Sequence, residues 1–363
     1  MSRLLPFSFL LIVLLSCTVQ EQPVTKDEAL AISRAIDSSI RNKKHNYFNS
    51  LINEKVFADK VAKASGSKVS NDFREGIKAA LKKGDLGDKI IKANQEANGT
   101  YELVKQYEKD KTQHLIFRLY SDEGLNYHDF ELTKKDGKPA IADILIYLSG
   151  EDLSKTIGDF FTSFSVNNKN VSNEEMAQVE KVKKMREMIE RNDADNALKY
   201  YQTLPTNLKN QRSIRMMHIM ICSQLDEATY MNAIDDYLAL YPDAPNLHLV
   251  MIDTYILRKE YGKAIESINE VDRLINTDPF LDYMRALMYN LMEKPAEARA
   301  HLENLYRNMP HFDAGALELI ANYVDAGDDS KARILIKEYE MNKDYDQSLL
   351  DNYLLIKSFN RDE

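Results

Sequence analysis

The chain has 363 residues, of which 44% are apolar and 29% charged, and a net charge of -9 at pH 7. This composition excludes a disordered or polytopic membrane protein, and the acidic balance argues against a nucleic-acid partner. The length favours two domains, or one domain and a repeat array. Two cysteines, Cys17 and Cys222, are too few for a disulfide framework.

Residues 1–16 have the composition of a signal peptide, with Arg3 followed by an apolar run that is too short to span a bilayer. The run ends in Leu14-Leu15-Ser16-Cys17, which resembles the lipobox of bacterial lipoproteins. The resemblance implies cleavage before Cys17 and lipidation of that cysteine, with residues 17–25 as a tether. Thr18 stands where an aspartate would suggest retention at the inner membrane, so we expect an anchor in the outer membrane of a bacterial cell envelope. An ordinary secretory signal is the alternative.

Residues 26–166 are predicted to form an α+β domain. A capping box at Thr25 and Glu28 opens a predicted helix over residues 25–48, and glycines divide the shorter helices that follow. Four segments then alternate with period two, at 101–108, 114–120, 125–133 and 140–148, and they predict an antiparallel four-stranded meander. A helix is expected over 153–164, before a polar linker. This order of elements resembles the nuclear-transport-factor-2-like (NTF2-like) cone, which implies a pocket between helices and sheet.

Residues 174–363 are predicted to be all α-helical and repetitive. Ala264, Ala298 and Ala332 are spaced by 34 residues, and a tyrosine precedes each alanine by nine positions. The pattern resembles the tetratricopeptide repeat (TPR), a helix pair that stacks into a solenoid. Ala233 and Ala197 suggest two further units, and residues 347–359 a C-terminal capping helix. A helical bundle without repeats is the alternative.

His128 and Asp143 are the candidate catalytic residues, because a histidine paired with a carboxylate inside a cone pocket would form a general base. Charged residues on strands more often form the wet face of an antiparallel sheet, so we expect no enzyme. His218 and Cys222 are one helical turn apart but make only two ligands, so no metal or other cofactor is predicted.

The resemblance to the TPR family implies a concave groove that holds a protein partner. Its groove positions fall on acidic, amide and apolar side chains, which suggests a neutral or basic partner segment; ordinary solvated helix faces are the alternative. These positions are Asn246, Leu249, Asp253, Tyr283, Asn290 and Asp325. The sequence therefore predicts a lipid-anchored interaction scaffold. A small-ligand binder or hydrolase that uses the cone pocket is the rival hypothesis.

Overall fold

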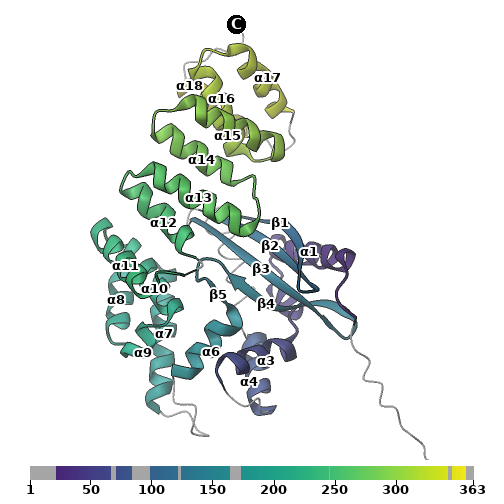
Figure 1. Ribbon diagram of the computed structural model, residues 1–363, viewed down its shortest axis with the longest axis vertical. Helices are drawn as coiled ribbons and strands as arrows, with labels where there is room; N and C mark the ends of the chain where they lie inside the picture. Colours follow the sequence, from purple (N-terminus) through teal and green to yellow (C-terminus); the bar gives the residue numbers. More distant parts are fainter. Residues whose placement is uncertain are drawn as a thin grey trace, which may run out of the picture.

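The computed structural model describes residues 22–66, 71–83, 99–121, 124–163, 173–244, 246–341 and 346–356. An antiparallel sheet with flanking helices forms the N-terminal half, and helices alone form the C-terminal half (Figure 1). The predicted order of an α+β domain followed by an all-α part is thus confirmed. The predicted signal peptide and Cys17 lie outside the described residues, as does most of the linker.

The first helix, α1 (Lys26–Arg41), begins with the predicted capping box. The Thr25 hydroxyl accepts from the Glu28 amide, and the Glu28 carboxylate accepts from the Thr25 amide. The helix does not continue to residue 48 as predicted, because Lys43 adopts a left-handed conformation with φ +57°. Three shorter helices follow: α2 (His45–Ser50), α3 (Glu54–Ala64) and α4 (Asn71–Lys83).

The sheet is a meander in which each strand pairs with the next, and its order is β1-β2-β3-β4-β5. The four predicted strands are present, each within a few residues of its predicted ends. A two-residue fifth strand, which the sequence did not predict, pairs with the end of the fourth. The strands are β1 (Thr100–Lys109), β2 (Thr112–Ser121), β3 (Gly124–Lys135), β4 (Lys138–Ile146) and β5 (Glu151–Asp152).

The two faces of the sheet contact different parts of the chain. Phe117 and Phe130 lie on the face that packs against the N-terminal helices, where they join an apolar core with Ile36, Phe48 and other side chains of those helices. Because side chains alternate along a strand, their neighbours Ile116 and Tyr127 point the opposite way. There they pack against the C-terminal half. The sheet is therefore buried between two sets of helices along part of its length.

After β5 the chain is helical. Helix α6 (Leu153–Ser163) leads into twelve further helices within the described residues, and α14 to α18 extend beyond the sheet (Figure 1). The helices are α7 (Asn173–Glu190), α8 (Ala194–Gln202), α9 (Thr206–Lys209), α10 (Arg212–Ser223), α11 (Glu227–Leu240), α12 (Leu247–Leu257), α13 (Tyr261–Ile275), α14 (Leu281–Leu291), α15 (Pro295–Asn308), α16 (Asp313–Asp325), α17 (Asp329–Glu340) and α18 (Gln347–Ile356).

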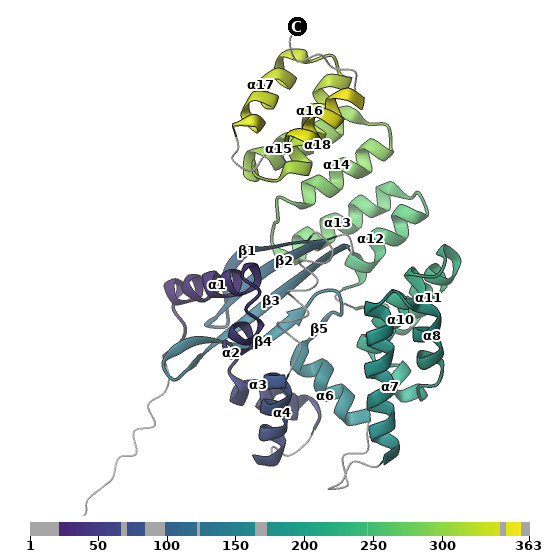
Figure 2. The same cartoon turned by 180° about the vertical axis from the view of Figure 1, so that it is seen from behind.

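Most of these helices pack as consecutive pairs, among them α12 with α13, α14 with α15, and α16 with α17 (Figure 2). Ala264, Ala298 and Ala332 are fully buried and lie in the second helix of these three pairs. The small side chain lets the two helices approach closely. The 34-residue spacing in the sequence thus coincides with equivalent buried positions in the structure.

Candidate functional site

The two predicted catalytic residues do not form a site together. His128 lies on the helix-packed face of the sheet, only 6% exposed, and its Nδ1 is 3.0 Å from the Tyr101 hydroxyl. Its Nε2 is 3.2 Å from the amide nitrogen of Asn126. The Asn126 oxygen already accepts from the amides of Tyr127 and Leu148, so its nitrogen donates to Nε2 and the imidazole is neutral. Burial lowers the pKa of His128 to about 4.

Asp143 has a structural role at the start of α6. Its carboxylate accepts from the amide and the hydroxyl of Ser154, and the Lys60 ammonium lies 3.7 Å away. Burial raises the pKa of this carboxyl although these partners oppose the shift. His128 therefore bonds to Tyr101 and Asn126, whereas Asp143 bonds to Ser154, and the two side chains share no hydrogen bond with each other. His128 is buried and contacts Tyr101 of the N-terminal core.

Three of the six predicted groove residues contact the N-terminal domain. The Asn246 amide donates to the carbonyl of Leu148, which follows β4, at 2.7 Å. Leu249 packs in one apolar cluster with Ile116 and Tyr127 of the sheet. Tyr283 is half-buried in the cluster that receives Tyr120, from the end of β2. The sheet therefore occupies positions that the sequence assigned to a separate protein partner.

The other three predicted groove residues remain exposed. The Asp253 side chain is exposed to solvent. The surrounding protein still desolvates its carboxyl in part, which raises the pKa of this group. Asn290, near the end of α14, and Asp325, at the end of α16, are exposed as well. Both belong to the part of the helical half that extends beyond the sheet (Figure 1). A partner would thus reach these positions without displacing the N-terminal domain.

A buried ion pair joins the sheet to the loop between α13 and α14. Arg118 Nη1, on β2, lies 2.7 and 2.8 Å from the two carboxylate oxygens of Asp278. The Tyr127 hydroxyl also donates to this carboxylate, at 2.9 Å. The guanidinium lies 4.4 Å from the centre of the Phe280 ring. Both charged side chains are at most 3% exposed, so the loop is held firmly to the sheet.

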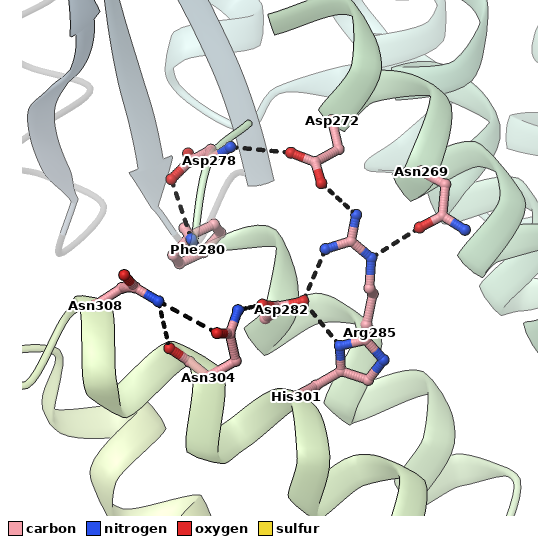
Figure 3. Close-up of polar contacts among 9 residues, drawn as sticks. All are labelled: Asn269, Asp272, Asp278, Phe280, Asp282, Arg285, His301, Asn304 and Asn308. Atoms are coloured by element: carbon pink, nitrogen blue, oxygen red, sulfur yellow. Dashed lines mark hydrogen bonds and ion pairs between the residues drawn. The ribbon is translucent and has the colours of Figure 1, made fainter. Parts of the chain in front are cut away.

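The polar contacts continue from this loop into the helix pairs (Figure 3). The Asp278 amide donates to Asp272, and Arg285 connects Asp272 with Asp282 through hydrogen bonds of 2.6 and 2.8 Å. Asp282 in turn contacts His301, on α15. Although burial opposes it, hydrogen bonds from His301, Asn304 and Arg285 lower the pKa of Asp282. A chain of charged contacts thus links the sheet with two successive helix pairs.

A pocket of about 470 Å³ opens on the sheet face that is turned toward the C-terminal half. Side chains of all five strands line it, and the end of α13 closes one side. Within it, the Asp129 carboxylate accepts from the Tyr107 hydroxyl and lies 3.1 Å from His114 Nδ1. The lining residues are Lys105, Tyr107, Lys109, His114, Ile116, Asp129, Glu131, Leu145, Tyr147, Asp152, Leu274, Ile275 and Asn276.

His114 is not among the predicted site residues, because its spacing to other ligand-type residues shows no pattern. The available signal was the segment Asp122-Glu123-Gly124, which predicts a hairpin turn, since a hairpin turn sets the register of its two strands. That register places His114 opposite Glu131 and Ile116 opposite Asp129. His114 and Asp129 are therefore diagonal neighbours on one face, within reach of each other. Such a pair can orient a ligand or exchange a proton with it.

Other chemistry in the described residues is limited. His218 Nε2 lies 3.5 Å from the Cys222 sulfur, and the imidazole stacks on Tyr201. Burial raises the pKa of the Cys222 thiol to about 11. Over the parts of the chain that the structure describes, no three His, Cys, Asp or Glu side chains are placed to share a metal ion. Over the same residues, no helix is both long and apolar enough to cross a bilayer.

Comparisons of the whole chain with protein families, with curated proteins and with solved structures return no match.

Proposed function

We propose that this protein is a lipid-anchored interaction scaffold of the bacterial cell envelope, in which a TPR-like helical half binds a protein partner. The 34-residue spacing of the buried alanines and the consecutive helix pairs support the repeat assignment. The lipobox at Cys17 supports the anchor. The N-terminal domain has its own helices on one face of the sheet and the helical half on the other. In this proposal it supports the helical half.

One observation carries the proposal. Side chains of the sheet pack in the same apolar clusters as Leu249 and Tyr283, whereas Asn290 and Asp325 are exposed. The Arg118–Asp278 ion pair holds the loop between α13 and α14 to the sheet, ahead of α14 to α18. The outer helices are thereby presented on a rigid support, which reduces the entropy lost when a partner binds.

The exposed positions indicate the chemistry of the partner. Asn290 and Asp325 carry an amide and a carboxylate, so an approaching segment would find hydrogen-bond acceptors and negative charge. A neutral or basic segment of a protein partner suits this surface. An acidic segment would be repelled, because like charges across an interface cost several kcal/mol.

The experiment compares two charge reversals of equal size. Asp325→Lys changes the proposed binding surface, and Glu297→Lys changes an exposed position on α15, in the second helix of a pair. Proteins cross-linked to each variant in native membranes are recovered and quantified. We expect Asp325→Lys to reduce recovery of the partner to below a tenth, and Glu297→Lys to leave it near the level of the unchanged chain. Equal recovery from both variants would exclude this surface.

The anchor is tested separately. Cys17→Ser removes the only side chain that the lipobox offers for acylation, so the protein should leave the membrane fraction. Labelled fatty acid should be incorporated into the unchanged chain and not into the variant. A Cys17→Ser variant that stays in salt-washed membranes would contradict the proposed anchor.

A further inference from the structure

The pocket between the sheet and α13 separates positive from negative charge. Its two lysines, Lys105 and Lys109, both lie on β1, at one edge of the sheet. Its carboxylates, Asp129, Glu131 and Asp152, lie on β3 and β5. A ligand in the pocket therefore meets cations on one side and anions on the other.

The three carboxylates differ in the hydrogen-bond partners that the protein already gives them. Glu131 accepts from Lys60 at 2.7 Å, and Asp129 accepts from Tyr107 and lies beside His114. Asp152 is exposed and lines the pocket, and within the described part of the chain no hydrogen bond or ion pair engages its side chain. Burial raises the pKa of its carboxyl, and the charge of Lys60 opposes that shift. This carboxylate can therefore still accept from an ammonium group of a ligand.

The cationic edge is arranged differently. The Lys105 ammonium lies 3.2 Å from the carbonyl of Asn276, at the end of α13, where the negative end of the helix dipole favours a cation. Two of its three N–H groups can still donate to an anion. Lys109 is exposed four residues farther along β1 and lines the same pocket.

The volume of the pocket limits the size of the ligand. Lys105 lies on β1 and Asp152 on β5, yet both line the same pocket of about 470 Å³. A pocket of this volume holds a small ligand of a few residues and not a long segment. Between the charged sides, Ile116 and Leu145 are apolar and Tyr107 and Tyr147 are aromatic. These side chains suit the uncharged middle of such a ligand.

We propose that this pocket binds a short zwitterion, of which a tripeptide with free termini is the simplest example. The ammonium end contacts Asp152 and the carboxylate end contacts Lys105. The middle of the ligand lies across Ile116, beside the His114–Asp129 pair. This site is independent of the protein-binding surface at Asn290 and Asp325, and either assignment can fail without the other.

The test is isothermal titration calorimetry of the full folded chain with trialanine. The control ligands are N-acetyl-trialanine, which lacks the ammonium, and trialanine amide, which lacks the carboxylate. We expect saturable binding of trialanine that weakens about tenfold or more with either control, because a hydrogen bond between charged groups contributes this much. Equal binding of all three ligands, or no saturable binding at 10 mM trialanine, would overturn the proposal.

Matched variants then assign the two ends. Asp152→Asn should weaken trialanine about tenfold and remove the difference between trialanine and its N-acetyl form. Lys105→Met should weaken trialanine about tenfold and remove the difference between trialanine and trialanine amide. Asp243→Asn and Lys63→Met change exposed residues outside the pocket and should leave binding within twofold. Loss of binding in these controls, or its retention in both pocket variants, would contradict the assigned orientation.

Discussion

Arg118 and Asp278 form a buried ion pair that connects the sheet with the helical half across 160 residues of sequence. The contact is reinforced by Tyr127, which donates to the same carboxylate, and by the Phe280 ring under the guanidinium. The pair holds the loop between α13 and α14 to the second strand of the sheet.

Arg118→Ala should lower the free energy of unfolding by about 3 to 5 kcal/mol, because Asp278 would remain as an uncompensated buried charge. The matched control is Arg258→Ala, which breaks an exposed ion pair with Asp235 and should cost less than about 1 kcal/mol. Urea unfolding of both variants provides the comparison. Similar losses would mean that the Arg118–Asp278 contact does not hold the two halves together.

Gly150 lies in the connection between β4 and β5, where the chain passes Asn246. Its φ is +66°, and a Cβ built there would be 2.8 Å from the Asn246 side-chain oxygen. Gly66 has nearly the same φ, +65°, with open space around it. Gly66→Ala should therefore cost only the backbone strain, about 1 to 2 kcal/mol. Gly150→Ala should cost about 1 to 3 kcal/mol more, through overpacking. Equal thermal midpoints would argue against close packing at this junction.

His128 should make the stability depend on pH. The pKa of its imidazole is about 4 in the folded chain, against an ordinary value of 6.5. Between these values the unfolded chain binds a proton that the folded chain does not, so the free energy of unfolding falls as the pH is lowered from 6.5 toward 4. The loss amounts to about 3 kcal/mol.

Urea titrations at pH 7.5 and 5.0 measure this dependence. His128→Gln cannot titrate and should lose less stability between the two pH values than the unchanged chain. His311→Gln, at a histidine whose side chain is 64% exposed, should leave the dependence as it was. A His128→Gln variant with an unchanged pH dependence would exclude His128 as its source.

Ala298 tests the register of the helix pairs. Its side chain is fully buried in α15, so Ala298→Leu should overpack the contact with α14 and cost about 1 to 3 kcal/mol. Glu297→Leu, one position earlier and exposed, should change stability by less than about 0.5 kcal/mol. Thermal unfolding of the two variants would contradict this packing if their midpoints were equal.

The local pattern of the sequence predicted the elements well where neighbours in the chain decide the structure. Alternation located the four long strands, and turn residues such as Asp110 and Gly137 adopt the positive φ angles that hairpins require. The end of α1 was predicted too late, because Lys43 carries no sequence signal for a left-handed conformation.

The candidate sites were harder to predict, because they depend on contacts between distant parts of the chain. Leu249 has the pattern of a groove residue, yet it is covered by Ile116, more than a hundred residues earlier. His128 and Asp129 are adjacent in sequence, but the pleat places the first in the core and the second in the pocket. Only the register of β2 and β3 shows that Asp129 meets His114 instead.

The most direct test of the account is to place a photo-reactive benzoyl-phenylalanine at Asn290, at Asp325 and at Glu297, one position at a time, in the lipid-anchored chain in its native envelope. The account predicts a protein adduct of the same mass increment from Asn290 and Asp325 and none from Glu297. It would be contradicted if Glu297 gave that adduct equally, or if neither Asn290 nor Asp325 gave one.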